Sequence, residues 1–303
     1  MKLLVIDGNS IINRAFYGVK SALTNAEGVP TNAVYGFTNL LLKTEAEYRP
    51  DMIACAFDRR EPTFRHKMYD GYKATRKGMP DELAVQMPLL KELLDSFGIC
   101  RLELAGYEAD DIIGTLSAKC EKEGVDCVIL TGDRDDFQLI GDKTKVAFTV
   151  TKNHETTTEL KGEAEIKAEY GGLTPRDLIE VKALMGDSSD NVPGVPGIGE
   201  KSALELIAAY KTLENLYDRL DDLKGSRREK LEAGRDSAFL SRDLVTIDRA
   251  VPLDVTFDDM VFARKATPAL MDNLRRLGFN SIIKKLDFES ASDPEPEKRP
   301  FPR

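Results

Sequence analysis

The stretch Met185-Gly-Asp-Ser-Ser-Asp-Asn-Val-Pro-Gly-Val-Pro-Gly-Ile-Gly-Glu-Lys201 joins two segments with helical periodicity. The apolar spacing predicts one helix over 175–185 and a second helix that begins near Glu200. Between them, Asp187 and Asp190 bring two carboxylates into a small polar loop, and carboxylate oxygens are the ligands that hard divalent cations prefer. The stretch therefore predicts a metal site beside a turn between two helices.

The second half of this stretch is the glycine turn Gly197-Ile198-Gly199. Glycines let a ligand approach the backbone because no Cβ is in the way, and N–H groups at a helix N-terminus bind phosphate. A nucleotide-binding loop fits less well, because Glu200 separates the last glycine from Lys201 and a helix, not a strand, precedes the turn. Taken alone, Asp187 and Asp190 also fit helix caps or turn residues.

Composition narrows the class of protein. With 303 residues and 42% apolar residues, the chain can form one large domain or two with a buried core. The apolar run after Met1 ends at Asp7, which does not fit a signal peptide, and no run approaches the length of a membrane span. The four cysteines show no C-x-x-C spacing and the two histidines are far apart, so zinc and a disulfide framework are disfavoured. We expect a cytoplasmic protein with no membrane partner.

The net charge of −9 argues against nucleic acid as a partner, but the distribution of charge does not. Residues 59–77 contain seven basic and two acidic side chains, with Phe64, Tyr69 and Tyr72 interleaved. Basic residues with aromatics grip single strands, through phosphate contacts and base stacking. A solvated, charged loop is the alternative interpretation of this segment.

The first half of the chain alternates strands and helices. Continuous apolar runs predict buried strands at 3–6, 52–57, 100–104 and 126–131, with helices after them. This order predicts a mostly parallel sheet with helices on both faces and a site at the carboxyl ends of the strands. Residues 152–161 fit a loop or hairpin, and 163–286 fit mostly helices.

Carboxylates follow these strand ends and return in the 185–201 stretch. Each aspartate alone also fits a helix cap or turn, but their shared position on one sheet edge favours a site. Without cations they would repel one another, and all-oxygen ligation suits Mg²⁺ or Mn²⁺. Two such ions roughly 4 Å apart form a clamp for phosphodiester cleavage. The candidate ligands are Asp7, Asp58, Glu108, Asp110, Asp111, Asp133, Asp135, Asp187 and Asp190. Lys73 and Arg76 would add positive charge at the phosphate.

Eight motifs occur in the order found in one known family. They are Asp7-Gly8-Asn9, Ala56-Phe57-Asp58, Phe64-Arg65-His66, Tyr72-Lys73-Ala74-Thr75-Arg76, Tyr107-Glu108-Ala109-Asp110-Asp111, Thr131-Gly132-Asp133-Arg134-Asp135, Gly186-Asp187-Ser188-Ser189-Asp190-Asn191 and Gly194-Val195-Pro196-Gly197-Ile198-Gly199-Glu200-Lys201. Over about residues 1–288 the chain resembles the 5′→3′ exonuclease domain of bacterial DNA polymerase I, in the flap endonuclease superfamily.

The resemblance implies a fold. It implies an α/β nuclease core over 1–162, PIN-like (resolvase-like), with a mostly parallel sheet flanked by helices and a helical arch at about 64–97. It also implies a helical DNA-binding region over 163–288, with a helix–hairpin–helix at about 175–210. Residues 289–303 are expected to be a Pro-rich linker or tail, and the protein is expected to be a monomer.

The resemblance also implies roles for residues. Asp7, Asp58, Glu108 and Asp110 would hold one ion, and Asp133, Asp135, Asp187 and Asp190 the other, with Asp111 in support. Lys73 and Arg76 would contact the scissile phosphate, and Tyr72 would stack on the terminal base. Further DNA contacts would come from Arg14, Arg65, Gly197, Gly199 and Lys201. A K⁺ ion would bind the hairpin through the carbonyls of Val195 and Ile198.

The implied function is 5′→3′ exonuclease and 5′-flap endonuclease activity in DNA replication and repair, with two Mg²⁺ or Mn²⁺ ions. The partners would be DNA with 5′ ends, nicks or flaps, and a covalently linked polymerase domain. Two alternatives stay open. A PIN-type ribonuclease would share the acidic sheet edge but lack the glycine hairpin and basic arch, and a non-catalytic duplex-binding module would leave the acidic cluster without a purpose.

Overall fold

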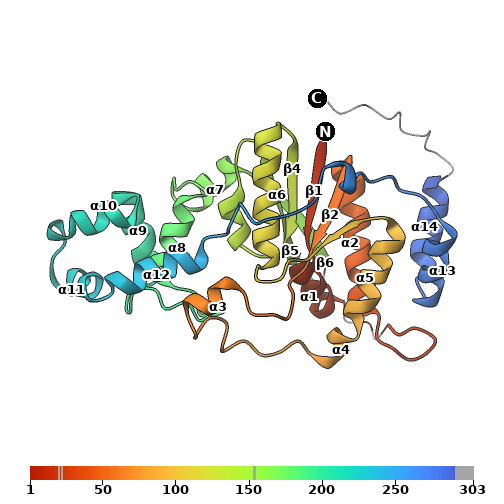
Figure 1. Ribbon diagram of the computed structural model, residues 1–303, viewed down its shortest axis with the longest axis horizontal. Coiled ribbons are helices and arrows are strands. Elements are labelled where there is room, and N and C mark those ends of the chain that lie inside the picture. The colour runs from red at the N-terminus through yellow and green to blue at the C-terminus, as the bar shows by residue number, and fades with distance from the viewer. Residues whose placement is uncertain (20, 22, 153–154, 291–303) are drawn as a thin grey trace.

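A six-stranded sheet forms the centre of the computed structural model, which describes residues 1–290 except 20, 22, 153 and 154 (Figure 1). The strand order is β3-β2-β1-β4-β5-β6, and every pairing is parallel except the antiparallel β5–β6. The strands are β1 (Lys2–Asp7), β2 (Met52–Ala56), β3 (Cys100–Leu102), β4 (Asp126–Thr131), β5 (Thr144–Lys152) and β6 (Glu155–Lys161). The Pro-rich tail expected at the C-terminus lies, from residue 291 on, outside the described residues.

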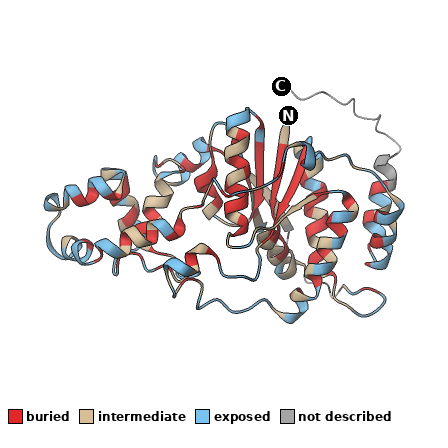
Figure 2. Ribbon diagram, viewed as in Figure 1, coloured by how far each residue is buried: buried red, intermediate tan, exposed pale blue. Residues whose placement is uncertain are grey.

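Alternation along β1 shows why helices cover both faces. Leu4 and Ile6 point into a core shared with α1 (Gly8–Gly18), α2 (Asn32–Tyr48) and α5 (Gln86–Phe97). Leu3 and Val5 point to the opposite face and pack with α6 (Ala109–Glu123). Successive strand residues face opposite sides, so a strand buried on both faces must be apolar throughout. Figure 2 shows the result, with buried residues in the strands and on the inner helix faces. This confirms the predicted mostly parallel α/β sheet.

A lobe of helices extends from one end of the sheet (Figure 1). Its helices are α7 (Glu163–Glu169), α8 (Asp177–Met185), α9 (Glu200–Tyr210), α10 (Leu213–Asp218), α11 (Gly225–Ala233) and α12 (Arg235–Val245), with the 3₁₀ turn η2 (Leu220–Asp222) between α10 and α11. A further 3₁₀ turn, η1 (Asp135–Leu139), lies between β4 and β5 and packs in the core on the α6 face of the sheet. Buried residues of α8 to α12 form a separate apolar core. Among the described residues no helix is long and apolar enough to cross a membrane.

The chain then returns to the sheet. After α12 the chain crosses the face of the sheet that α6 covers. Ile247 and Val255 join the core of that face, and so does Met260, the last residue of η3 (Asp258–Met260). Helices α13 (Pro268–Arg276) and α14 (Asn280–Ser290) pack on the opposite face, beside α2 and α5. The region 163–288 therefore contributes to three cores, those of the two sheet faces and that of the helical lobe. The domain boundary expected at 162/163 stays a prediction.

The polar segment 152–161, expected as a loop or hairpin, belongs to a β-hairpin. That hairpin is longer than expected, because its first strand already begins at Thr144 and pairs with β4. Val146 and Ala147 are fully buried, whereas β6 consists largely of threonine, glutamate and lysine. The second strand is an edge strand, and its polar side chains reflect exposure to solvent.

The expected helical arch at 64–97 also needs correction. Only α3 (Phe64–Met68) and α4 (Asp81–Ala84) are helical before α5, and residues 69–80 form turns and irregular backbone. Helix α5 is a core helix, because its Leu90 and Leu93 are buried against the sheet. We use the term arch for residues 58–80, which leave β2, pass the helical lobe and return to α4 (Figure 1).

A buried ion pair anchors the arch. The Arg65 guanidinium donates to both Asp111 oxygens, at 2.8 and 2.7 Å, and also to the carbonyls of Leu244 and Thr246, each at 2.8 Å. The two charged side chains are 3% and 0% exposed. Arg65 thus joins three elements, namely α3, α6 and the end of α12. Breaking such a pair is costly because it leaves one charge buried and uncompensated.

We predict that Arg65→Ala lowers the free energy of unfolding by about 3–5 kcal/mol. Stability is lost because the buried Asp111 carboxylate would have no cationic partner and the carbonyls of Leu244 and Thr246 would lose their hydrogen-bond donor. Urea denaturation measures it. The matched control is Arg59→Ala, which removes an exposed partner of Glu61 and should leave the unfolding midpoint nearly unchanged. Equal midpoints for both variants would contradict the anchoring role.

Candidate metal and nucleic-acid site

The carboxylates reach one sheet edge because strands end in them. Asp7 is the last residue of β1 and the N-cap of α1, where it accepts a hydrogen bond from Ser10 N at 3.0 Å. Asp58 follows β2 and accepts from Ala109 N at the start of α6. Asp133 follows β4, and its N–H donates to Thr131 Oγ1. Turn and cap geometry therefore holds each side chain at the carboxyl end of the sheet.

A cleft of about 580 Å³ opens at this edge. Seven of the predicted metal ligands line it together with three basic side chains. The acidic residues are Asp7, Asp58, Glu108, Asp110, Asp133, Asp135 and Asp190, and the basic residues are Arg14, Lys73 and Arg76. Asp187 lines a smaller adjoining cavity that shares Glu108, Asp110, Asp135 and Asp190 with the cleft. The structure thus brings eight of the nine predicted carboxylates together.

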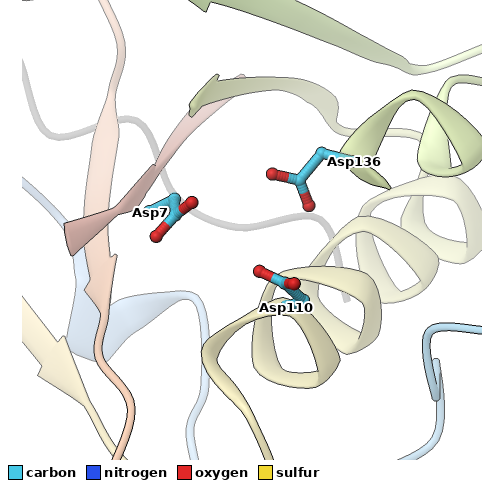
Figure 3. Close-up of side chains that lie close together, drawn as sticks. All are labelled: Asp7, Asp110 and Asp136. Carbon is cyan, nitrogen blue, oxygen red and sulfur yellow. The ribbon is translucent and has the colours of Figure 1, made fainter. Parts of the chain in front are cut away.

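Asp7, Asp110 and Asp136 form the tightest group. One carboxylate oxygen from each lies within 4.8 Å of the others, and the three side chains point toward one another (Figure 3). Both oxygens of Asp136 are buried and lack a hydrogen-bond donor in the described part of the chain. The sequence analysis missed Asp136. Its only signal was that it follows Asp135 directly after a strand-end motif.

Burial and repulsion between neighbouring carboxylates raise pKa values at this edge of the sheet. Burial, with repulsion from Asp133 and Asp58, raises the pKa of Asp7 to about 7. Burial and neighbouring carboxylates raise the pKa of Asp110 and of Asp136 well above the usual range. Burial likewise raises the pKa of Asp58. Buried oxygens without donors and with mutual repulsion fit a hard divalent cation, which would neutralise them.

Lys182 neutralises a second group of carboxylates. Its ammonium contacts Asp135 and lies 2.6 Å from Asp187. Burial opposes ionisation of Asp187, but Lys182 and the Ser189 donors outweigh it and lower the pKa of Asp187 to about 2. Burial and Asp133 raise the pKa of Asp135 to about 6 despite the same lysine. The sequence analysis did not identify Lys182 as a partner of these carboxylates. The available signal was that Lys182 is the only lysine or arginine between 177 and 190.

The loop from Asp187 to Val192 has a fixed shape. The two residues exchange backbone hydrogen bonds of 2.9 and 2.8 Å, which closes a short hairpin around Asp190. Gly186 and Gly194 lie back to back beneath it, at φ +74° and +59°. A Cβ on Gly194 would lie 2.3 Å from Gly186 N, so only glycine fits this crossing.

The arch is held against these carboxylates. Lys73 Nζ lies 2.8 Å from Glu108, Arg76 contacts Asp190, and Lys73 N donates to the Asp190 carbonyl at 2.8 Å. Asn191 Nδ2 donates to Gly71 O at 2.7 Å. Lys73 has φ +55°, a left-handed conformation that is unfavourable for a non-glycine residue by about 1–2 kcal/mol. The surrounding contacts hold this strain at a residue predicted to meet phosphate.

Three predicted roles do not agree with this geometry. Arg65 is 2% exposed and its donors are occupied, so it is not placed to contact DNA. Asp111 is fully buried and both its oxygens bind Arg65, so it is not placed as a metal ligand. Tyr72 is 4% exposed, with its hydroxyl donating to Glu108 at 3.0 Å and its ring edge-on to His66, so it offers no face for stacking.

The glycine turn caps α9 as predicted. Gly197 has φ +80°, Ile198 N donates to the Val195 carbonyl at 3.0 Å, and Gly199 is the N-cap residue. Space for a Cβ at Gly199 is open, and Lys201 is exposed in the first turn of α9. The backbone of α9's first turn therefore faces accessible space. No described contact tests the predicted roles of Val195 and Ile198 as potassium ligands, so these roles stay predictions.

Two family descriptions match the chain. Residues 2–171 match the 5′-3′ exonuclease, N-terminal resolvase-like domain. Residues 173–268 match the 5′-3′ exonuclease, C-terminal SAM fold. Together they cover the sheet, the arch and the helical lobe described above.

Two curated bacterial proteins are similar in sequence to this chain. The DNA polymerase I of Caldicellulosiruptor bescii is 46% identical over 96% of this chain, which corresponds to 34% of that protein. The DNA polymerase I of Bacillus subtilis is 42% identical over 96% of this chain, or 33% of that protein. The chain spans about a third of the length of these curated relatives.

Solved structures share the fold. T5 5′-exonuclease with bound zinc has a TM-score of 0.64 at 19% identity, covering 95% of this chain and 98% of that chain. The catalytic core of Rad2 in complex with DNA substrate has a TM-score of 0.59 at 21% identity, covering 94% and 92%.

The unpaired Asp136 carboxylate generates a prediction about stability. The raised pKa values of Asp7, Asp110 and Asp136 mean that the folded state keeps protons that an unfolded carboxyl loses above about pH 4. Stability without divalent ions should therefore fall as pH rises from about 4 through about 7. Asp136→Asn prevents this carboxyl from becoming charged, so it should raise stability in EDTA at the high-pH end and flatten the pH profile.

The measurement is the unfolding midpoint between about pH 5 and pH 8, in EDTA and in Mg²⁺. Mg²⁺ should stabilise the wild-type protein more than Asp136→Asn, because ligand binding stabilises only as far as it favours the folded state. Asp142→Asn, at a residue outside the cleft, is the control. A destabilised Asp136→Asn in EDTA would show that the carboxylate has a structural partner.

Proposed function

Because the chain belongs to the 5′-3′ exonuclease family, we propose that it is a structure-specific 5′ nuclease that hydrolyses DNA phosphodiesters with two divalent ions. One observation supports this most strongly. A single cleft is lined by seven carboxylates, which we call its floor, together with Lys73 and Arg76 of the arch. Carboxylates suit divalent ions, and the cations suit a phosphate held between arch and floor.

The residues divide into two ligand groups. Asp7, Asp110 and Asp136 form one, with Asp58 and Glu108 beside them. We assign Asp133, Asp135, Asp187 and Asp190 to the other, in which Lys182 contacts Asp135 and Asp187. Bound Mg²⁺ or Mn²⁺ would lower the pKa of a water nucleophile and neutralise charge on the reacting phosphate.

The basic residues act on the phosphate. Lys73 and Arg76 each contact a carboxylate of the cleft, so their charges lie within one side-chain length of its floor. Glu108 and Asp190 would hold divalent ions, and Lys73 and Arg76 would then no longer have these carboxylates as competing partners. The two basic side chains would stabilise negative charge that develops on the phosphate. Arg14, whose Nη2 donates to Gly132 O, extends the positive wall along α1.

Duplex DNA would bind the helical lobe. The free N–H groups at the start of α9, Gly197, Gly199 and the exposed Lys201 suit backbone phosphate, which positions a duplex without reading its sequence. A K⁺ ion held by the Val195 and Ile198 carbonyls would complete this hairpin. The chain corresponds to about a third of the length of its DNA polymerase I relatives, which supports a covalently linked polymerase domain. The role proposed with it is primer or flap removal in the cytoplasm.

We predict that the protein cleaves 5′-flap DNA in Mg²⁺ or Mn²⁺ and not in EDTA. The reason is that the cleft offers carboxylates and basic residues but no histidine or cysteine nucleophile among its lining residues. A gel assay of an end-labelled flap substrate, run beside an RNA strand of the same sequence, measures it. Undiminished hydrolysis in EDTA would sink the two-ion mechanism, and preference for the RNA would favour a ribonuclease.

We predict that Lys73→Ala lowers the single-turnover rate by about 10²–10³-fold while Kd for flap DNA changes only a few-fold. Its charge lies over the cleft floor, where charge develops on the phosphate. Lys67→Ala is the matched control, because Lys67 belongs to the same arch but is exposed on α3 outside the cleft. It should weaken binding slightly and leave the rate unchanged. Equal losses of affinity alone for both variants would remove Lys73 from the catalytic residues.

A further inference from the structure

The arch leaves a requirement for base stacking unmet. Single-strand binding sites usually combine phosphate contacts with aromatic rings that stack on bases. Tyr72, the aromatic residue expected to do this, is buried with its hydroxyl between Glu108 and Asp190. Another aromatic side chain at the cleft would have to supply the stacking face.

Tyr17 occupies such a position. Among the large apolar side chains of the described residues it has the highest exposed fraction, 68%, and it lines the cleft that holds the carboxylates. Scattered exposed apolar residues are ordinary, but this ring lies at a polar, acidic cleft. Its neighbour Phe16 packs against the core and meets the Tyr17 ring edge-on, with centroids 5.0 Å apart. The exposed ring is therefore braced.

One face of α1 leads from the carboxylates to this ring. Six α1 residues line the cleft at helical spacing, namely Asn9, Ser10, Asn13, Arg14, Tyr17 and Gly18. Asp7 caps the N-terminus of the same helix. Ten residues at 1.5 Å each place Tyr17 about 15 Å from Asp7 along the helix, or about four base steps of 3.4 Å. The cleft-lining side chains of α1 are polar from Asn9 to Arg14, and Tyr17 adds an aromatic ring beyond them.

We propose that Tyr17 is a stacking platform for a base of the DNA strand whose phosphate enters the carboxylate cleft, a few nucleotides from the bond that is cut. This inference rests on the proposed nuclease function and adds a residue that fixes the position of the strand. Tyr17 touches the substrate away from the reacting phosphate, so it sets register and affinity. The π face carries the interaction, and the hydroxyl is not required.

Three substitutions at one position test the inference. Tyr17→Phe keeps the ring, Tyr17→Leu keeps apolar surface without a ring, and Tyr17→Ala removes both. Kd for 5′-flap DNA is measured in EDTA by fluorescence anisotropy, after thermal unfolding has shown that each variant is folded. We expect Phe to bind like wild type, and Leu and Ala to bind about tenfold more weakly.

Position is tested with 2-aminopurine placed at successive nucleotides on either side of the cleavage site. Wild type and Tyr17→Phe should quench its fluorescence at one or two adjacent positions, and Tyr17→Leu should not. Unchanged Kd and unchanged quenching in Tyr17→Leu would overturn the inference, as would a loss of affinity with the same quenching pattern. Metal-dependent cleavage by the wild-type protein is scored separately, so the nuclease function can stand or fall on its own.

Discussion

Mutual repulsion among carboxylates gathered at one sheet edge is the constraint on which the rest of this structure depends. Burial alone disfavours each charge, and proximity adds to the cost, as the raised pKa values of Asp7, Asp110 and Asp136 show. Basic side chains from separate elements form ion pairs with carboxylates at this edge. Lys73 comes from the arch, Arg76 from its next turn and Lys182 from α8. Charge compensation therefore holds the arch and the helical lobe against the sheet.

This arrangement gives the same basic residues two possible partners. Ion pairs at half-buried sites are maintained only while both charges persist, and a divalent ion competes for the carboxylate. Divalent ions would therefore free Lys73, Arg76 and Lys182 at the moment when the cleft becomes able to accept a phosphate. The positive φ of Lys73 indicates that its position is imposed by these contacts rather than by local preference. The arch thus lies at the edge of the cleft, which Lys73 and Arg76 line.

Sequence patterns predicted the sheet and its acidic edge because both are local properties. A strand buried on both faces must be apolar along its length, and the turn after it favours aspartate. The choice between Asp110 and Asp111 is not local. Adjacent residues on a helix point about 100° apart, so only one of them can face Asp7. The structure places Asp110 in the cluster and Asp111 against Arg65. Asp136 was missed for the same reason, since its direction depends on how η1 packs beneath the cleft.

The 185–201 stretch explains how binding and chemistry are kept in register. Asp190 lines the cleft and Asp187 lines the adjoining cavity. Gly197, only seven residues after Asp190, belongs to the turn before α9, the helix that would meet duplex phosphate. The crossing of Gly186 and Gly194 and the support of Ser237 and Ser241 from α12 leave little freedom between the two. Under the proposed function, a duplex held at the turn would therefore meet the cleft at a fixed separation. The cleavage position would then follow from backbone geometry, without a contact to base edges.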